Sequence, residues 1–242
     1  GAGAALIKTP ELAQEIVRQT QAGVKDWQHG KKITELPDIT SEIVKIVQAR
    51  HDELPTEFQQ KRAVPVSVKT RVGYDIPVIS EWIPTLLELQ PACIALHGRT
   101  LRQQYSGLAD WERIGEAAEL AKGSNTLVLG NGDVDSLETA QQRIAYYKLD
   151  GVLIGRASFG NPYIFREEMS ASDASLFSIA VEHAKMFEET YQANDNYAFL
   201  PMRKNLGWYV LSIPNAKEVR AELFQTESSQ EVQEILSRHG LV

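Results

Sequence analysis

Cysteine is almost absent from this chain of 242 residues, which contains only Cys93. A single cysteine excludes an internal disulfide and any metal site built from several cysteines. The sequence also has no apolar run close to the roughly 18 residues of a membrane helix, and it does not start with the charged and then apolar pattern of a signal peptide. These absences predict a cytoplasmic protein without a metal or a membrane partner.

An excess of positive charge is absent too. The chain has 25 Lys and Arg against 32 Asp and Glu, and its formal net charge is −7. This balance argues against nonspecific nucleic-acid binding through bulk charge, although it is compatible with a local basic groove. The hydrophobic fraction of 43% is close to the globular average, and a chain of this length can bury a core.

The first third of the chain is irregular. After a small, apolar start at residues 1–6, Thr9 and Pro10 predict the N-cap and first position of a helix that Gly23 can end. Residues 26–62 are polar and hold one expected helix at 41–51, so we interpret this segment as a surface excursion.

A regular alternation follows, in which short apolar runs predict strands and amphipathic stretches predict helices. This pattern is typical of parallel βα units. The expected strands are 64–69, 93–97, 126–129 and 151–154, and the expected helices between them are 80–89, 111–122 and 136–147. From about residue 172 only helices are expected, at 180–191, 202–211, 216–224 and 231–239. We therefore predict a βα domain over 1–168 and a helical domain over 169–242.

Polar side chains follow the carboxyl end of every predicted strand. In parallel α/β folds ligands bind at this edge, because the βα loops converge there. The four clusters are Lys69-Thr70-Arg71, His97-Gly98-Arg99-Thr100, Gly130-Asn131-Gly132-Asp133 and Gly155-Arg156. Four such clusters in succession predict one binding site.

Each cluster has a plainer interpretation beside the functional one. Gly132 and Gly155 allow backbone N–H groups to approach an anion, and Arg156 adds a bidentate donor, which together favour a phosphate site. The alternative is that the glycines only make tight turns. Lys69 could neutralise a ring or a phosphate, or it could pair with a carboxylate, and we expect its ammonium to have a partner at the end of a buried strand.

His97 could donate to a cofactor or act as an acid or base, whereas a lone histidine is more often structural. Arg71 and Arg99 could hold a polyanionic substrate, or they could be solvated charges at the rim. Cys93 lies at the opposite end of its strand, so we interpret it as a packed small hydrophobic residue and not as a nucleophile.

Several of these segments resemble the tRNA-dihydrouridine synthase family. The resemblance is carried by VKTRVG (68–73), LHGRT (96–100), QYSG (104–107), GNGDV (130–134), DGVLIGRA (150–157), GNPYIF (160–165), MRK (202–204) and GWY (207–209), and it leaves out the polar segment 26–62. It implies a βα barrel that binds FMN, followed by a helical tRNA-binding domain. It also implies that NADPH reduces the flavin, that the flavin passes hydride to a uracil ring in tRNA, and that a cysteine protonates the neighbouring carbon.

The resemblance also implies roles for individual residues. Lys69 and His97 would contact the flavin ring system. The remaining implied residues are Asn131, Gly132 and Asp133 along the ribityl-phosphate side, Gly155 and Arg156 on the phosphate, and Arg71, Arg99, Arg203 and Lys204 as candidates for holding the RNA.

One family feature is missing from this chain. The proton-donating cysteine of the family stands in an N-x-G-C-P segment just upstream of a stretch like residues 1–6. We therefore expect the family cysteine to lie upstream of Gly1, and we expect no catalytic residue within this chain.

The expected fold is α/β: the C-terminal four βα units of a TIM-type barrel and an all-helical C-terminal domain. A fragment, a split-gene product and a half that pairs with a second chain all fit this pattern. Two other functions fit as well, namely an inactive RNA-binding or assembly module of the same fold, and another FMN- or phosphate-binding barrel acting on a small molecule.

Overall fold

The computed structural model describes residues 3–166, 173–194 and 196–242. They form two compact units, one of residues 1–132 and 143–153 and the other of residues 133–142 and 154–242. The predicted domain boundary between residues 168 and 169 lies outside the described residues, as do Gly1 and Ala2 of the apolar start. We describe each unit by itself.

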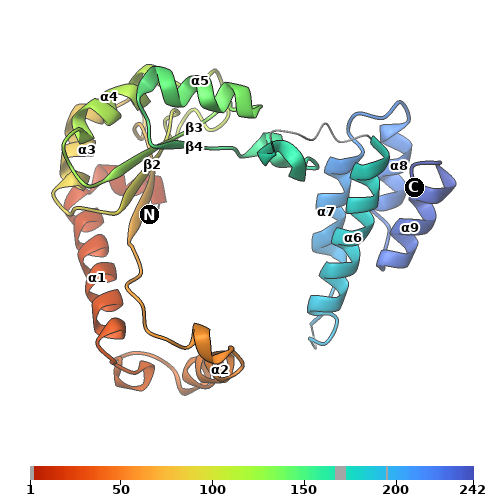
Figure 1. The fold of residues 1–242 in the computed structure, drawn as a ribbon, viewed down its shortest axis with the longest axis horizontal. Coiled ribbons are helices and arrows are strands. Elements are labelled where there is room, and N and C mark those ends of the chain that lie inside the picture. The colour runs from red at the N-terminus through yellow and green to blue at the C-terminus, as the bar shows by residue number, and fades with distance from the viewer. Residues whose placement is uncertain (1–2, 167–172, 195) are drawn as a thin grey trace. The chain divides into compact units, whose positions relative to one another are not determined.

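The first unit contains a parallel sheet of four strands in the order β1-β2-β3-β4 (Figure 1). The strands are β1 (Ser67–Arg71), β2 (Cys93–His97), β3 (Leu127–Asn131) and β4 (Gly151–Leu153). The predicted parallel βα pattern is confirmed, but the predicted bounds of β1 were three residues too early at its start. Pro65 has no N–H to donate to a ladder, and the pairing with β2 begins at Ser67 and continues to Arg71.

Helices cover one face of this sheet. α3 (Ile79–Leu87) and α4 (Trp111–Ala121) follow β1 and β2, and α5 (Leu137–Tyr147) follows β3 (Figure 1). On this face the indole Nε1 of Trp82 donates to Thr70 Oγ1 at 3.0 Å. A Cβ on Gly130 would lie 2.6 Å from the Trp111 ring, so glycine at this position lets α4 pack directly on β3. Ile94 and Leu96 of β2 are fully buried beneath these helices.

The opposite face of the sheet is partly exposed. Its side chains belong to the alternate residues of each strand. Leu127 is 51% exposed, and Cys93, Ala95 and Leu129 are only half-buried. Parallel sheets are normally covered on both faces. An apolar surface of the sheet is thus left open among the described residues.

The helix before the sheet differs from the prediction at both of its ends. α1 (Pro10–Gln28) does not end at Gly23 but continues for more than a turn beyond it, and Thr9 makes no side-chain cap. A glycine inside a helix costs only about 1 kcal/mol. The side chain of Gln21 donates to the carbonyl of Leu89 at 2.9 Å, which holds this part of α1 against the chain after α3.

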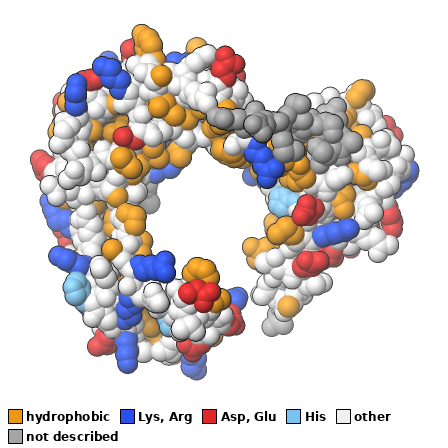
Figure 2. Space-filling view, viewed as in Figure 1, with side chains coloured by type: hydrophobic (Ala, Val, Ile, Leu, Met, Phe, Trp, Pro, Cys, Tyr) orange, Lys and Arg blue, Asp and Glu red, His pale blue; other side chains and the backbone are white. Residues whose placement is uncertain are grey.

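The polar segment forms α2 (Ser41–Asp52) between two short 3₁₀ turns, η2 (Ile33–Glu35) and η3 (Thr56–Phe58). Thr40 caps α2 by accepting from the backbone N–H of Ile43 at 3.4 Å. No residue of α2 is buried, so its apolar stripe faces solvent in the described structure. Hydrophobic side chains are visible on the surface of the first unit in Figure 2.

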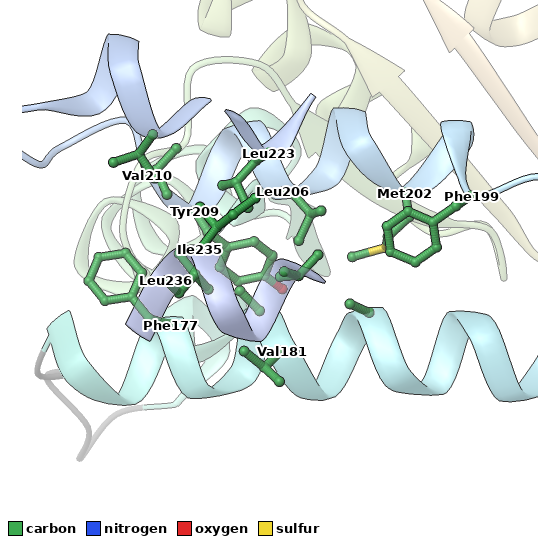
Figure 3. Packing of buried hydrophobic residues seen from close by; sticks show 14 residues of the cluster. Phe177, Val181, Phe199, Met202, Leu206, Tyr209, Val210, Leu223, Ile235 and Leu236 are labelled. Carbon is green, nitrogen blue, oxygen red and sulfur yellow. The ribbon is translucent and has the colours of Figure 1, made fainter. Parts of the chain in front are cut away.

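The second unit is helical. Its elements are η4 (Arg156–Ser158), η5 (Pro162–Phe165), α6 (Asp173–Tyr191), α7 (Leu200–Tyr209), α8 (Ala216–Leu223) and α9 (Ser229–Arg238). Figure 3 shows the core, a cluster to which α6 contributes Phe177 and Val181, α7 contributes Met202 and Leu206, and α8 and α9 contribute Leu223 and Ile235. The four helices expected after residue 180 are present, and α6 begins seven residues earlier than expected.

A contact between Glu222 of α8 and the C-terminal end of α9 makes the stability of this unit depend on pH. The pKa of Glu222 lies below its ordinary value of 4.5, first because its carboxylate accepts a hydrogen bond from His239 Nε2 (2.9 Å) and also because Arg238 lies 2.7 Å away. A carboxyl with a lowered folded pKa stabilises the fold above its unfolded pKa, and this contribution is lost as the pH falls through the folded value. We expect the melting temperature of the wild type to exceed that of Glu222→Gln at neutral pH and the two to converge below pH 4.5, measured by thermal unfolding. A constant difference over the whole range would contradict this.

Candidate functional site

The sheet register brings predicted site residues from neighbouring strands into one row. Arg71, His97, Asn131 and Leu153 are register partners at the carboxyl edge of β1 to β4. Lys69 lies two residues before Arg71 and so projects from the same face of the sheet. Three of the residues predicted to contact a flavin, Lys69, His97 and Asn131, therefore share one face near one edge. This is the face that the helices leave open.

Gly132 lies against His97 at this edge. The backbone of Gly132 has a φ of +129°, and a Cβ there would lie 2.5 Å from Ala109 Cβ and 3.2 Å from His97 Cδ2. Its carbonyl accepts from Trp111 Nε1 at 3.1 Å. The position requires glycine because both the backbone angle and the space exclude a side chain. His97 itself is 7% exposed, so its imidazole has a fixed environment.

Asn131 and Lys69 have different settings. Asn131 Nδ2 donates to the Leu153 carbonyl at 3.0 Å and links the ends of β3 and β4. The side chain of Lys69 is exposed, and within the described residues its ammonium forms no ion pair or hydrogen bond. The alternative in which Lys69 pairs with a neighbouring carboxylate is not observed within the described residues, whereas the alternative in which it neutralises a ring or a phosphate stays a prediction. Its positive charge is available to an anion.

The guanidinium groups of Arg71 and Arg99 bind the loop that follows β2. Arg71 Nη1 donates to the carbonyls of Thr100 (3.0 Å) and Gln104 (3.4 Å). Arg99 is 2% exposed, and its Nη2 donates to the Gly107 carbonyl at 2.6 Å. Neither arginine is a solvated rim charge. These hydrogen bonds fix the course of the backbone from Thr100 to Gly107. The sequence motifs did not predict that the two arginines would bind backbone carbonyls.

Arg156 and Asp133 form an ion pair within the second unit. Arg156 Nη2 lies 2.8 Å from Asp133 Oδ1, with the side chains 56% and 25% exposed. Asp133 directly follows Gly132, and Arg156 stands three residues after the end of β4. Gly155 has a φ of −104°, and a Cβ on it would meet nothing within 4 Å. The backbone there does not demand glycine, in contrast to Gly132.

Arg203 and Lys204 of α7 also differ from each other. Arg203 Nε donates to the Thr226 carbonyl at 2.7 Å, and its side chain is 21% exposed, so it mainly ties α7 to the segment before α9. Lys204 is exposed, with its Nζ 5.4 Å from the centre of the Trp208 ring. Of the two, only Lys204 offers its charge to solvent.

Two further classes of site find no support in the part of the chain that is described. Within it, no three His, Cys, Asp or Glu side chains are grouped so as to hold a metal ion. Burial raises the pKa of the Cys93 thiol, and Cys93 is the first residue of β2, away from the carboxyl edge, so a nucleophilic cysteine at that edge has no support.

No helix of the described chain is long and apolar enough to cross a membrane.

The catalytic cysteine of the family was expected upstream of Gly1. The structure contains only residues of this sequence, so it does not test this expectation, which stays a prediction. What the described residues do show is that Cys93, the one cysteine of the chain, is not part of the row at the carboxyl edge.

Comparison with known proteins identifies the family. The sequence model of a protein family, described as "Dihydrouridine synthase (Dus)", matches residues 37–240. The chain belongs to the dihydrouridine synthase family. This match takes in most of the polar segment 26–62, which the motif resemblance had left out, so that segment is in large part family sequence.

Relatives named "Probable tRNA-dihydrouridine synthase" agree with this membership. One from Staphylococcus epidermidis is 30% identical over 241 residues, covering 98% of this chain and 61% of the relative. One from Staphylococcus aureus (strain Mu50) is 30% identical over 204 residues, covering 83% and 58%, respectively. A "Probable tRNA-dihydrouridine synthase 1" from Synechocystis is 30% identical over 221 residues, covering 86% and 58%. The chain thus spans about three fifths of the length of these relatives.

Proposed function

We propose that this chain forms part of an FMN-dependent tRNA-dihydrouridine synthase, which reduces uridine in tRNA to 5,6-dihydrouridine with NADPH as the reductant. The observation that carries the proposal is that His97 and Asn131 of the register row share one open face of the sheet with Lys69, which lies two residues before the row on β1. A tRNA substrate and a cytoplasmic location belong to the same proposal.

The residues at this edge fit a flavin nucleotide. The ammonium of Lys69 is exposed, and Gly132 keeps the space beside His97 free of a side chain. We assign Lys69 and His97 to the ring system, and the remaining groups to the ribityl-phosphate part: Asn131, Gly132, Asp133, Gly155 and Arg156. FMN, when bound, supplies the hydride acceptor and donor that no amino-acid side chain can provide. Lys69 contributes positive charge toward it, and Asn131 holds the ends of β3 and β4 together through Leu153.

For the RNA we assign different roles to the four candidate cations. Arg71 and Arg99 act as positioning residues that hold the loop after β2 through backbone carbonyls. Arg203 holds the segment before α9 in the same way. Lys204 is the candidate for a direct phosphate contact, because its ammonium is exposed.

The open face of the sheet supports a barrel that this chain alone does not close. Four strands are present in the described residues, whereas a complete TIM-type barrel has eight. Half-exposed apolar residues such as Leu127 and Leu129 would be covered in a closed barrel. We propose that further strands, from a segment before Gly1 or from a second chain, cover this face, and that the proton-donating cysteine belongs to them.

The test is the reaction itself. The complete protein with FMN and NADPH should convert an unmodified tRNA transcript, and mass spectrometry of the nucleosides should detect uridine that has gained two hydrogen atoms. A protein that binds FMN and tRNA but yields no dihydrouridine would contradict the enzymatic proposal.

A second candidate is an inactive RNA-binding or assembly module of the same fold. The observation that favours it is that Cys93, the one cysteine of this sequence, lies at the amino end of β2 and not at the carboxyl edge. The same experiment separates the two, because the module would bind tRNA without forming product.

A further inference from the structure

The second unit contains a cavity whose lining includes none of the residues assigned to the flavin. It has a volume of about 540 Å³ and is lined by the start of α5, the segment around η5 and the end of α7. Its volume lies in the range of pockets that bind small ligands, and one nucleotide is a ligand of that size. The lining side chains used below are Asp135, Phe159, Tyr163, Arg166 and Trp208.

Aromatic rings form one wall of this cavity. Phe159 stacks on Trp208 with ring centres 4.1 Å apart and planes at 11°. Phe159 is still 44% exposed, so this ring pair is not sealed in a core. Gly160 holds the pair in place, since a Cβ there would lie 2.6 Å from the Trp208 carbonyl carbon. Phe159, Tyr163 and Trp208 thus bring three aromatic side chains to the lining of the cavity, and Phe159 is partly exposed there.

Charged and polar groups of two signs line the same cavity. The guanidinium of Arg166 lies 5.6 Å from the centre of the Tyr163 ring, and the Arg166 side chain is exposed. The Asp135 carboxylate also lines the cavity and accepts from Thr139 Oγ1 at 2.8 Å. Because a carboxylate is negatively charged, it disfavours a phosphate beside it inside the cavity. It can accept hydrogen bonds from the amino or imino groups of a nucleobase. The arginine can hold a phosphate or stack on a base.

We propose that this cavity is an RNA subsite that takes one unstacked nucleobase, with Tyr163, Phe159 and Trp208 as the stacking surface and Arg166 on the adjoining phosphate. Single-stranded RNA is recognised in this way, by aromatic rings and arginine planes. The subsite deepens the proposed function and rests on it, because it assumes an RNA substrate.

The experiment compares variants of the complete protein. They are chosen so that the effect of losing an aromatic ring or a charge on tRNA binding can be told apart from an effect on folding. Tyr163→Leu removes the ring but keeps apolar volume, whereas Tyr163→Phe keeps the ring. Arg166→Gln removes a charge inside the cavity, and Arg62→Gln removes an exposed one elsewhere in the chain. Binding of an unmodified tRNA transcript is measured at fixed salt, and ultraviolet crosslinking followed by mass spectrometry identifies the peptides that touch RNA.

We expect the dissociation constant for tRNA to rise about tenfold in Tyr163→Leu and Arg166→Gln, in line with the loss of one stacked base. Tyr163→Phe and Arg62→Gln should bind within about twofold of the wild type, and a crosslink should map to residues 159–166. Tight wild-type binding that is unchanged in Tyr163→Leu and Arg166→Gln would overturn the subsite and leave the proposed function intact. A wild type that neither binds nor modifies tRNA would overturn both.

Discussion

Arg156→Ala is expected to raise the dissociation constant of the complete protein for FMN by about 10- to 100-fold. The substitution removes a charge-assisted, bidentate contact to a phosphate, which is typically worth about 1.5–3 kcal/mol. It also leaves Asp133, whose carboxylate lies 2.8 Å from the Arg156 guanidinium, without that neutralising partner beside an anion. Fluorescence titration of the apoprotein with FMN measures the effect.

The same substitution should hardly affect stability. The Arg156 side chain is 56% exposed, and exposed ion pairs contribute about 0–1 kcal/mol. A loss of flavin affinity with an unchanged melting temperature of the apoprotein would therefore locate the effect in the binding site. Unchanged flavin affinity would remove Arg156 from the site.

Two further variants divide the roles of the pair. Arg156→Lys keeps the charge but not the bidentate geometry, so it should fall between the wild type and Arg156→Ala. Asp133→Asn should weaken binding if the carboxylate accepts hydrogen bonds from the ribityl hydroxyls. It should strengthen binding if Asp133 only competes with the phosphate for Arg156.

The sequence predicted the strands well where a short apolar run ended in polar residues. β2 has the predicted bounds, because Cys93 to His97 is a continuous run whose pairing partners lie on both sides. β1 was misplaced since hydrophobicity does not reveal where a ladder begins, and Pro65 lies outside it. The end of α1 was missed for a related reason, as Gly23 can either end a helix or be tolerated within it.

The candidate site was predictable only in part. The alternation of strands and helices placed Lys69, His97 and Asn131 at one edge, because parallel strands align their carboxyl ends. The contacts of Arg71 and Arg99 were not predictable, since the carbonyls they bind belong to a loop without regular structure. The ion pair of Arg156 with Asp133 joins residues 23 positions apart in the sequence, and no local pattern encodes it.

Gly160→Ala is expected to destabilise the second unit by about 3 kcal/mol or more. The φ of Gly160 is +70°, and a Cβ would lie 2.6 Å from the carbonyl carbon of Trp208 and 2.9 Å from the backbone nitrogen of Tyr209. These are backbone atoms of α7, which cannot swing away as the end of a side chain can. The methyl group must therefore push the segment at 159–165 off α7, which would also break the stacking of Phe159 on Trp208.

Gly240→Ala is the matched control in the same unit. Its φ is +66°, nearly that of Gly160, but a Cβ there meets nothing within 4 Å. It should cost only the strain of a left-handed backbone at alanine, about 1–2 kcal/mol. Denaturant unfolding of both variants separates strain from steric overlap, because the difference between them isolates the contact with Trp208. Equal losses in the two variants would mean that the segment at 159–165 is not packed tightly on α7, and with it the aromatic wall of the proposed RNA subsite would lose its support.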